Sequence, residues 1–404
     1  MNNELEAQLS AMTSGTLTPI VRKLLKDEEA TLINWSFKRL PGGDANPITA
    51  GIYRFSGQAI IKTDEIPWSL ILKVVQWVDF TGTPLEKNYI NKPADWNYWK
   101  REALAYKSGV LDQVQGSLVP VKAIEIIEPT ESSVWIWQME VQEPHRSDWK
   151  LARHILAAQH FGEFAGAHVG FIPNPQQDPW FCRSFIRQWT QDGAELGLTD
   201  LTHDVVFWDN PDVKLALPLV TAKRLESLLK DADHLCDVLE KQPQTLSHQD
   251  PHWTNLFATH DTNGNEITTV IDWSYLGLAA VGEDLGTQIA GNISYCHINP
   301  LEAKKYHEAA LHAYLTGLQK SVWHGDERSV RFACNATAAL QYATFELLML
   351  KWALEDKAKG RSSWIEELAQ KQNMERNEAL MNWGKGITFL FDLADEARVL
   401  AAQL

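Results

Sequence analysis

The segment between residues 248 and 273 constrains the fold of this chain more than any other. Asn263-Gly264 is a strong signal for a tight hairpin turn, and a short apolar strand lies on each side of it. Antiparallel pairing would bring Asn255, at the start of the first strand, and Asp272, at the close of the second, to the same end of the ribbon. Asp250 lies on the loop just before them. The sequence therefore predicts one amide and two carboxylates gathered at one place.

These three side chains suit a magnesium–nucleotide phosphoryl-transfer site. Magnesium binds hard oxygen ligands, keeps several waters and needs only one or two protein carboxylates. Phosphoryl transfer needs positioning more than a strong base, so a further carboxylate of ordinary pKa can orient the attacking hydroxyl. We predict Asn255 and Asp272 as metal ligands and Asp250 as the base. Taken alone, Asp250 is better explained as a loop aspartate that forms a turn with its own backbone before Pro251, and the whole signature favours the catalytic role.

Composition excludes several functional classes. A formal net charge of -15 argues against a general nucleic-acid binder, which needs a basic face. The first residues lack the features of a signal peptide, and no apolar run is long enough to span a bilayer. We expect a cytoplasmic protein that binds neither nucleic acid nor membrane, of undetermined oligomeric state. Neither a disulfide framework nor a cysteine zinc site is implied by the scattered cysteines, Cys182, Cys236, Cys296 and Cys334.

The order of predicted elements divides the chain into two parts. Helical spacing is found in residues 17–27 and 94–111, and strand-like runs are found in residues 31–40, 48–61, 68–77, 121–127 and 134–141. Turn-forming residues separate the first two strands, in the cluster Pro41-Gly42-Gly43-Asp44. Helical periods dominate after residue 145, and the stretch 328–402 predicts long helices broken near Gly360. We expect an α+β protein with domains 1–140 and 141–404.

Lys73 is a lone cation inside the apolar strand Ser69–Val75. A buried lysine is costly unless it is paired, and Glu102, on the following helix, is its natural partner. In kinases such a pair holds the lysine against the α- and β-phosphates of the nucleotide. The alternative is a lysine at the strand edge that points to solvent.

Three motifs in the second half of the chain resemble those of the aminoglycoside phosphotransferase and choline kinase family. They are His248-Gln249-Asp250-Pro251-His252-Trp253-Thr254-Asn255, Ile271-Asp272-Trp273 and Gly282-Glu283-Asp284-Leu285. The family usually has glycine where this chain has Gln249. Gly42-Gly43 stands in place of a full GxGxxG nucleotide loop.

The resemblance implies a two-lobed protein-kinase-like fold, with a small antiparallel-sheet N-lobe and a larger, mainly helical C-lobe. It implies transfer of the γ-phosphate of Mg-ATP, or of GTP, to a hydroxyl of a small metabolite or aminoglycoside-like compound, with Asp250 as the base. It assigns magnesium to Asn255 and Asp272, and nucleotide binding to Lys73 and Glu102. The adenine would be read by the backbone of Glu140 and Val141.

Other residues of the motifs receive supporting roles. His248 and Asp284 are expected to brace the catalytic loop. His252 either contacts phosphate or metal-bound water, or packs as a structural histidine.

The sequence leaves two alternative functions open and does not identify the molecule that accepts the phosphate. His248-x-Asp250-x-His252 is superficially similar to the ligands of a zinc hydrolase, although no companion histidine motif is present. A catalytically weak, kinase-like nucleotide-binding module would fit Gln249 and the poor glycine loop. Acceptor specificity is expected in the insert 173–215 and in the terminal helices. The side chains noted there are Asp178, Trp180, Trp189, Asp192, Glu195, Trp208, Asp209, Glu346, Trp352, Glu355 and Asp356.

Overall fold

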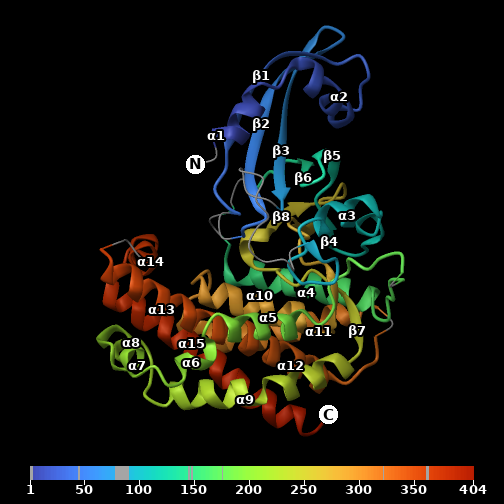
Figure 1. Cartoon of the computed structure of the whole chain (residues 1–404). Coiled ribbons are helices and arrows are strands. Elements are labelled where there is room, and N and C mark those ends of the chain that lie inside the picture. The colour runs from blue at the N-terminus through green and yellow to red at the C-terminus, as the bar shows by residue number, and fades with distance from the viewer. Residues whose placement is uncertain are drawn as a thin grey trace.

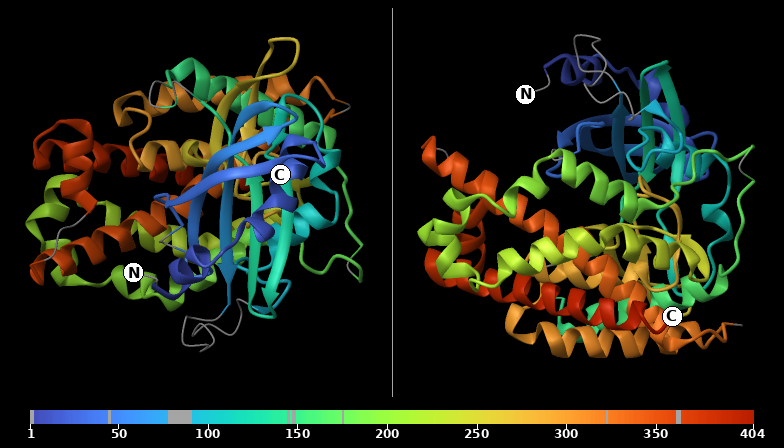
Figure 2. Two further views of the ribbon diagram at one scale, coloured as in Figure 1. Left: turned by 90° about the horizontal axis from the view of Figure 1, so that it is seen from above. Right: turned by 60° about the horizontal axis from the view of Figure 1, so that its bottom comes forward.

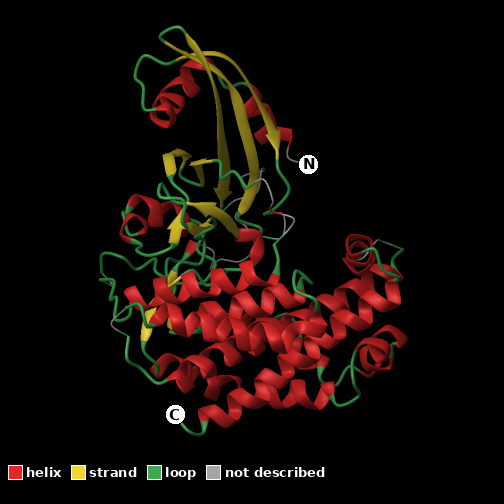
Figure 3. Ribbon diagram, turned by 180° about the vertical axis from the view of Figure 1, so that it is seen from behind, coloured by secondary structure: helices red, strands yellow, loops and turns green. Residues whose placement is uncertain are grey.

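The computed structural model describes residues 3–43, 46–77, 91–143, 146, 149–174, 176–321, 323–360 and 364–404. The chain forms a sheet-rich lobe above a larger helical lobe (Figure 1), and the strands gather almost entirely in the upper part of the molecule (Figure 3). The predicted two-lobed α+β architecture is confirmed. Asp44 and Pro175, which belong to the predicted turn cluster and insert, lie outside the described residues.

The N-lobe is built on a five-stranded antiparallel sheet with the order β1-β2-β3-β6-β5. Its strands are β1 (Thr31–Arg39), β2 (Thr49–Ile61), β3 (Asp64–Gln76), β5 (Ala123–Thr130) and β6 (Ser133–Met139). All five coincide with predicted strands to within a few residues. The helices of this lobe are α1 (Asn3–Ser10), α2 (Ser14–Leu25) and α3 (Arg101–Lys107).

The two faces of this sheet bury different sets of side chains, because successive residues of a strand point to opposite sides. On β3, Leu72 and Val74 face a core that includes Leu9 of α1 and Leu17 of α2. Val75 faces the opposite side, where residues of α3 pack. Lys73, between Leu72 and Val74, therefore points toward α3. The alternation of side chains along β3 is therefore sufficient to place Lys73 on the face of the sheet against which α3, with Glu102, packs.

The predicted helix over residues 94–111 is wrong in length, since the chain is helical only in α3. The carbonyl groups of Pro93, Asp95 and Trp96 accept hydrogen bonds from the guanidinium of Arg101, and residues 91–100 fold as turns. The helix ends before Gly109, whose φ of 74° lies in the left-handed region that glycine tolerates.

The C-lobe is a helical body that also contains two short sheets. Its helices are α4 (Leu151–Ala167), α5 (Phe185–Glu195), α6 (Leu198–Leu201), α7 (Val205–Asp209), α8 (Pro211–Ala216), α9 (Thr221–Lys241), α10 (Glu283–Ser294), α11 (Ala303–Leu318), α12 (Glu327–Thr337), a π-helix (Ala338–Ala343), α13 (Thr344–Ala358), α14 (Trp364–Gln372) and α15 (Arg376–Ala401). The last of these runs across the lobe and packs on α12 (Figure 2). The predicted break near Gly360 is present between α13 and α14. Among the described helices, none is both long and apolar enough to cross a membrane.

One strand from the N-terminal half pairs with the C-lobe. β4 (Leu118–Pro120) runs parallel to β9 (Glu266–Val270), which pairs on its other side with β8 (Leu256–His260). β7 (Gln244–Ser247) and β10 (Gly277–Ala280) form a separate antiparallel pair. The domain limits 1–140 and 141–404 stay a prediction, and residues 118–120 join the two parts by backbone hydrogen bonds.

Helices α4 and α11 approach closely beneath the ribbon. A Cβ atom added at Gly162 of α4 would lie 2.1 Å from the carbonyl oxygen of Tyr314, and one added at Gly317 of α11 would lie 2.1 Å from that of Gln159. The glycines thus allow the two backbones to touch. Phe161, beside Gly162, packs edge-on against the ring of His248, so this contact supports the catalytic loop.

We predict that Gly162→Ala destabilises the protein by about 3 kcal/mol, because the added methyl group overpacks a backbone contact. Gly193→Ala on α5 is the matched control, since its Cβ would meet only Leu198 Cδ2 at an ordinary 3.5 Å. The control should gain about 0.5–1 kcal/mol from helix propensity. Urea unfolding measures both. Equal free energies for the two variants would contradict the close approach of α4 and α11.

Candidate active site

The ribbon expected from the sequence is present and brings two of the predicted residues together. Leu256 pairs with Val270, and the N–H of Ile271 donates to the carbonyl of Asn255 over 3.0 Å. The turn at the other end is held by Asp261, whose Oδ1 accepts the backbone N–H groups of residues 263 and 265. Asn255 and Asp272 therefore lie at the same end, as predicted.

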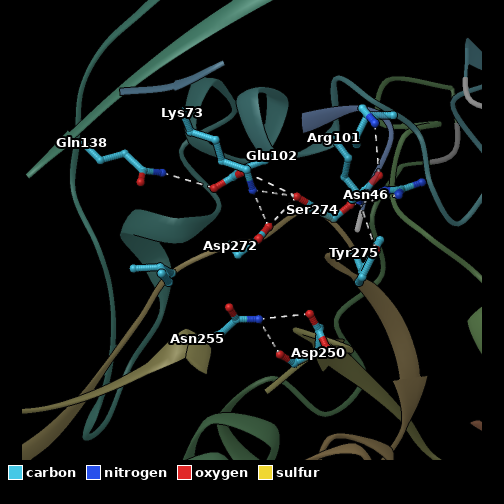
Figure 4. A network of polar contacts seen from close by, with 12 residues as sticks. Asn46, Lys73, Arg101, Glu102, Gln138, Asp250, Asn255, Asp272, Ser274 and Tyr275 are labelled. Carbon is cyan, nitrogen blue, oxygen red and sulfur yellow. Dashed lines mark hydrogen bonds and ion pairs between the residues drawn. The ribbon is translucent and has the colours of Figure 1, made fainter. Parts of the chain in front are cut away.

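Asn255 is oriented by Asp250. Its Nδ2 donates to the backbone carbonyl and to the Oδ2 of Asp250, both over 3.0 Å (Figure 4). Because two acceptors identify the nitrogen, the amide oxygen must face the other way. Within the described part of the chain, this Oδ1 has no hydrogen-bond partner and remains available to a cation.

Asp272 adopts φ 62°, a left-handed conformation that costs a non-glycine residue about 1–2 kcal/mol. The following side chain, Trp273, is completely buried and packs 4.7 Å from the ring of His248, which holds the turn in place. The Oδ1 of Asp272 accepts hydrogen bonds from Lys73 Nζ at 2.6 Å and Ser274 Oγ at 2.5 Å. Burial acts to raise the pKa of Asp272, but Lys73 and these hydrogen bonds lower it to about 2. The carboxylate is therefore ionised at neutral pH.

Lys73 lies between two carboxylates from different lobes. Its Nζ is 2.6 Å from Glu102 Oε2 and 2.6 Å from Asp272 Oδ1, and only 6% of its side chain is exposed. Burial acts to lower the pKa of Lys73, yet Asp272 and Glu102 together raise it above the ordinary value. The predicted contact with Glu102 is present. Gln138 adds a hydrogen bond of 3.2 Å to the other oxygen of Glu102.

Ser274 is a member of this charge cluster that the sequence did not reveal. Its hydroxyl accepts from Lys73 over 3.2 Å and donates to Asp272 (Figure 4). A polar residue two positions after Asp272, inside an otherwise buried turn, was the available signal.

Asp284 braces the catalytic loop, as predicted. Its Oδ1 accepts from Ser247 Oγ and from the N–H of Gln249, each over 2.7 Å, and its Oδ2 accepts from the N–H of His248 over 3.1 Å. The carboxylate sits in the first turn of α10 and is buried. These three bonds fix the backbone immediately before Asp250.

His248 is also a brace, as predicted. Its Nδ1 accepts the N–H of Asp250 over 3.2 Å, and its Nε2 donates to the carbonyl of Ile271 over 2.9 Å. The ring therefore ties the catalytic loop to the end of the ribbon. Both ring nitrogens are occupied by backbone groups, which counts against His248 as a zinc ligand.

Gln249, which stands where the resemblance leads one to expect glycine, has φ 66°. Its side chain is buried, and its Nε2 donates to the carbonyl of Leu278 over 3.3 Å. Its Oε1 has no hydrogen-bond partner among the residues that the structure describes. The backbone thus takes the left-handed conformation for which glycine is favoured, at some cost in strain.

His252 lies beside the predicted base. Its Nε2 is 3.4 Å from Asp250 Oδ1, and its Nδ1 is 2.7 Å from Thr254 Oγ1. Burial acts to lower the pKa of His252, and Asp250 raises it above the ordinary value. Its ring packs 5.5 Å from that of Tyr295, so it is both packed and in contact with the base.

Glu140 and Val141 follow β6 and are not part of this cluster. The carboxylate of Glu140 binds Arg54 and Ser69 on the neighbouring strands β2 and β3. Its side chain is therefore directed to the sheet. A role of these two residues through their backbone stays a prediction.

The loop after β1 reaches the C-lobe. Gly42 and Gly43 have φ of 114° and 77°. Asn46 donates from Nδ2 to the hydroxyl of Tyr275 and to Oδ1 of Asn97, each over 3.3 Å (Figure 4). The predicted nucleotide loop therefore lies near the turn that follows Asp272.

Part of the predicted acceptor region lies near Asp250. Burial raises the pKa of Tyr342, and the nearby Tyr295, Asp250 and Glu346 raise it further. Glu346 of α13 is buried, and its Oε2 accepts from Trp383 Nε1 over 3.1 Å. Trp180, also expected there, is instead a core residue.

Residues 181–329 match the model of a family described as the phosphotransferase enzyme family. This segment contains the catalytic loop, the ribbon and the start of α10. No curated protein matches the sequence.

Several solved structures are similar at low identity. A spectinomycin phosphotransferase in complex with ADP and spectinomycin is 13% identical, with 90% of this chain and 93% of that chain covered and a TM-score of 0.45. An aminoglycoside phosphotransferase from Streptomyces rimosus in complex with ADP and streptomycin is 15% identical, with coverages of 82% and 100% and a TM-score of 0.41. A Plasmodium vivax ethanolamine kinase is 11% identical, with coverages of 88% and 81% and a TM-score of 0.48.

Glu283, beside Asp284, makes folding sensitive to pH. Burial raises the pKa of Glu283 to about 8, although its carboxyl accepts the N–H of Ala280 over 2.6 Å. The unfolded chain ionises this group near its ordinary pKa of 4.5. Its stabilising contribution is therefore complete below that value and is lost as the pH rises toward 8.

We predict that the free energy of unfolding falls between about pH 5 and pH 8, and that Glu283→Gln reduces this slope by up to about 1.4 kcal/mol per pH unit. Urea unfolding at a series of pH values measures the slope. Glu378→Gln, at an exposed position of α15, is the control and should leave it unchanged. Identical slopes for wild type and Glu283→Gln would show that Glu283 titrates as an exposed acid.

Proposed function

We propose that this chain, whose residues 181–329 match the model of the phosphotransferase enzyme family, transfers the γ-phosphoryl group of a magnesium–nucleoside triphosphate to a hydroxyl of a small molecule. The acceptor oxygen attacks the γ-phosphorus, and the bond from that phosphorus to the bridging oxygen of the β-phosphate breaks. The hydroxyl proton passes to Asp250. The products are a phosphate ester and a nucleoside diphosphate.

One observation carries this proposal: the ribbon end gathers Asn255 and Asp272 next to Asp250, while Lys73 joins Asp272 from the other lobe. Transfer of this kind needs an aligned base and cations on the phosphates, rather than covalent participation by the protein. The cluster supplies the base and one fixed cation. The hydrogen bonds of Asp284 and His248 already hold the loop that carries Asp250 in place.

The donor set at the ribbon end fits magnesium. Asn255 would offer its amide oxygen, which the bonds from Nδ2 to Asp250 leave free, and Asp272 an ionised carboxylate whose side chain is 34% exposed. These are hard oxygen ligands, few in number, as magnesium requires. When bound, magnesium would neutralise charge on the phosphate oxygens.

Nucleotide binding is proposed for Lys73, steadied by Glu102, and for the backbone of Glu140 and Val141. Lys73 keeps its charge despite burial, and its Nζ already contacts the carboxylate that would hold the metal. Backbone reading of the base is compatible with either ATP or GTP. The contact of Asn46 with Tyr275 supports nucleotide binding near this point.

We predict that Asp250→Asn lowers phosphate transfer by at least about 100-fold, the usual range for loss of a positioned base. Nucleotide affinity should change less than about threefold, since the amide retains an oxygen at the same position. Coupled detection of nucleoside diphosphate measures transfer, and fluorescence or calorimetry measures binding. Asp112→Asn, at an exposed position, is the control.

Full transfer by Asp250→Asn would refute the assigned base. If wild type bound nucleotide but phosphorylated no hydroxyl compound, the weak nucleotide-binding module would be the better description. Stoichiometric zinc in the purified protein would favour the hydrolase instead.

For the acceptor, we propose an amine-bearing alcohol. Glu346 is a buried acid whose only hydrogen bond among the described residues comes from Trp383. Burial raises its pKa to about 7. The charges of Glu346 and Asp250 both raise the pKa of Tyr295. Glu346 therefore lies in the same neighbourhood as Asp250. A bound ammonium group would supply the missing counter-charge.

Glu346→Gln is predicted to raise the KM of amine-bearing acceptors by about 10- to 100-fold, which corresponds to a lost charge-assisted hydrogen bond. The KM of neutral alcohols should be unchanged. Glu131→Gln, at an exposed position in the N-lobe, is the control. A panel of amino alcohols, sugars and antibiotics with magnesium nucleotide provides the assay. Equal effects on amine-bearing and neutral acceptors would exclude an ionic contact.

A further inference from the structure

Arg101 is completely buried, and five backbone carbonyl groups surround its guanidinium. Nε donates to Trp180 over 2.7 Å, and Nη1 donates to Ser274 over 3.1 Å and to Trp96. Nη2 donates to Pro93 over 3.2 Å and to Asp95. Among the described residues, no ion pair accompanies these bonds. All five of these hydrogen bonds are therefore accepted by backbone carbonyls.

The five carbonyls come from three separate places in the chain. Residues 93–96 lead into α3, Trp180 precedes α5 in the C-lobe, and Ser274 follows the predicted metal ligand by two residues. Arg101 itself is the first residue of α3 and is adjacent to Glu102. One side chain thus joins the helix that carries Glu102 to the C-lobe turn that carries Asp272.

Only arginine can make this junction. A buried charge must be fully hydrogen-bonded to be tolerated, and the planar guanidinium offers five N–H donors in a fixed fork. Lysine offers three donors from a single point and cannot reach carbonyls on three sides. Burial lowers the pKa of Arg101, but an arginine remains charged in proteins.

Ser274 connects the junction to the charge cluster. Its carbonyl accepts from Arg101, while its hydroxyl accepts from Lys73 and donates to Asp272 Oδ1 (Figure 4). A displacement of this residue would therefore move Asp272 relative to Lys73. The position of α3 and the position of the predicted metal ligand depend on the same guanidinium.

We propose that Arg101 is a positioning residue that docks α3 on the C-lobe and so keeps the Lys73–Glu102 pair aligned with Asp272. The proposal rests on the proposed function for its effect on catalysis, but its structural part does not. The Lys73–Glu102 ion pair then forms without an added ligand or modification, because the groups that bind Arg101 are backbone carbonyls of the chain itself.

The test compares Arg101→Lys and Arg101→Met with Lys100→Met. The control changes the neighbouring residue, whose ammonium binds Glu128 at the surface over 2.8 Å. Hydrogen exchange of peptides covering residues 93–107 and 271–278 gives a readout that is independent of activity. Steady-state kinetics separate kcat from the KM of nucleotide and acceptor.

Both Arg101 variants should exchange amide hydrogens in these two peptides at least about tenfold faster, with the ribbon strands β8 and β9 unchanged. Their kcat should fall about 10- to 100-fold, and the KM of the acceptor should stay within about threefold. Lys100→Met should behave as wild type. Ser274→Ala, which keeps the carbonyl, should lower kcat without faster exchange in residues 93–107.

Wild-type exchange and kcat in Arg101→Lys would overturn the proposal. Faster exchange over the whole chain would also overturn it, because Arg101 would then act only through global stability. If no acceptor is phosphorylated even by wild type, but exchange rises only in the two peptides, the docking role holds and the proposed function fails.

Discussion

The site depends on the two ion pairs made by the buried ammonium group of Lys73. This group is held at 2.6 Å by Glu102 from the N-lobe and at 2.6 Å by Asp272 from the C-lobe. A charge removed from water requires such partners, so the two lobes must meet where this ammonium lies. The sheet supplies the lysine by strand alternation, and α3 and the ribbon each supply one carboxylate.

The surroundings of this ammonium are fixed mainly by hydrogen bonds to backbone. Asp284 and His248 bind backbone N–H groups of the loop that leads to Asp250. Arg101 binds carbonyls of the segment before α3 and of two C-lobe residues, Trp180 and Ser274. Two residues with side chains, Gln249 and Asp272, are held in the left-handed conformation. Strain of this kind persists only where the surrounding contacts determine the backbone, and it concentrates at functional sites.

Sequence patterns were most informative where the structure is local. The hairpin was predictable because Asn263-Gly264 defines the turn and the flanking strands alternate, so the position of Asn255 relative to Asp272 followed directly. The helix over 94–111 was not predictable in length, because distant residues decide it. Arg101 donates hydrogen bonds to the carbonyls of residues 93, 95 and 96. It also donates to the carbonyls of Trp180 and Ser274 in the C-lobe. The pattern of apolar residues in 94–111 does not indicate that Arg101 has those partners.

The sequence by itself determined the α+β order of elements and the ribbon that brings Asn255 and Asp272 together, since short-range turn and strand signals suffice for these. Tertiary structure alone decided that Ser274 joins the charge cluster, that residues 118–120 pair with the C-lobe ribbon, and that Glu140 turns toward Arg54. These contacts bring together residues far apart in the chain, where hydrogen-bond geometry and burial, rather than local propensity, select the partner.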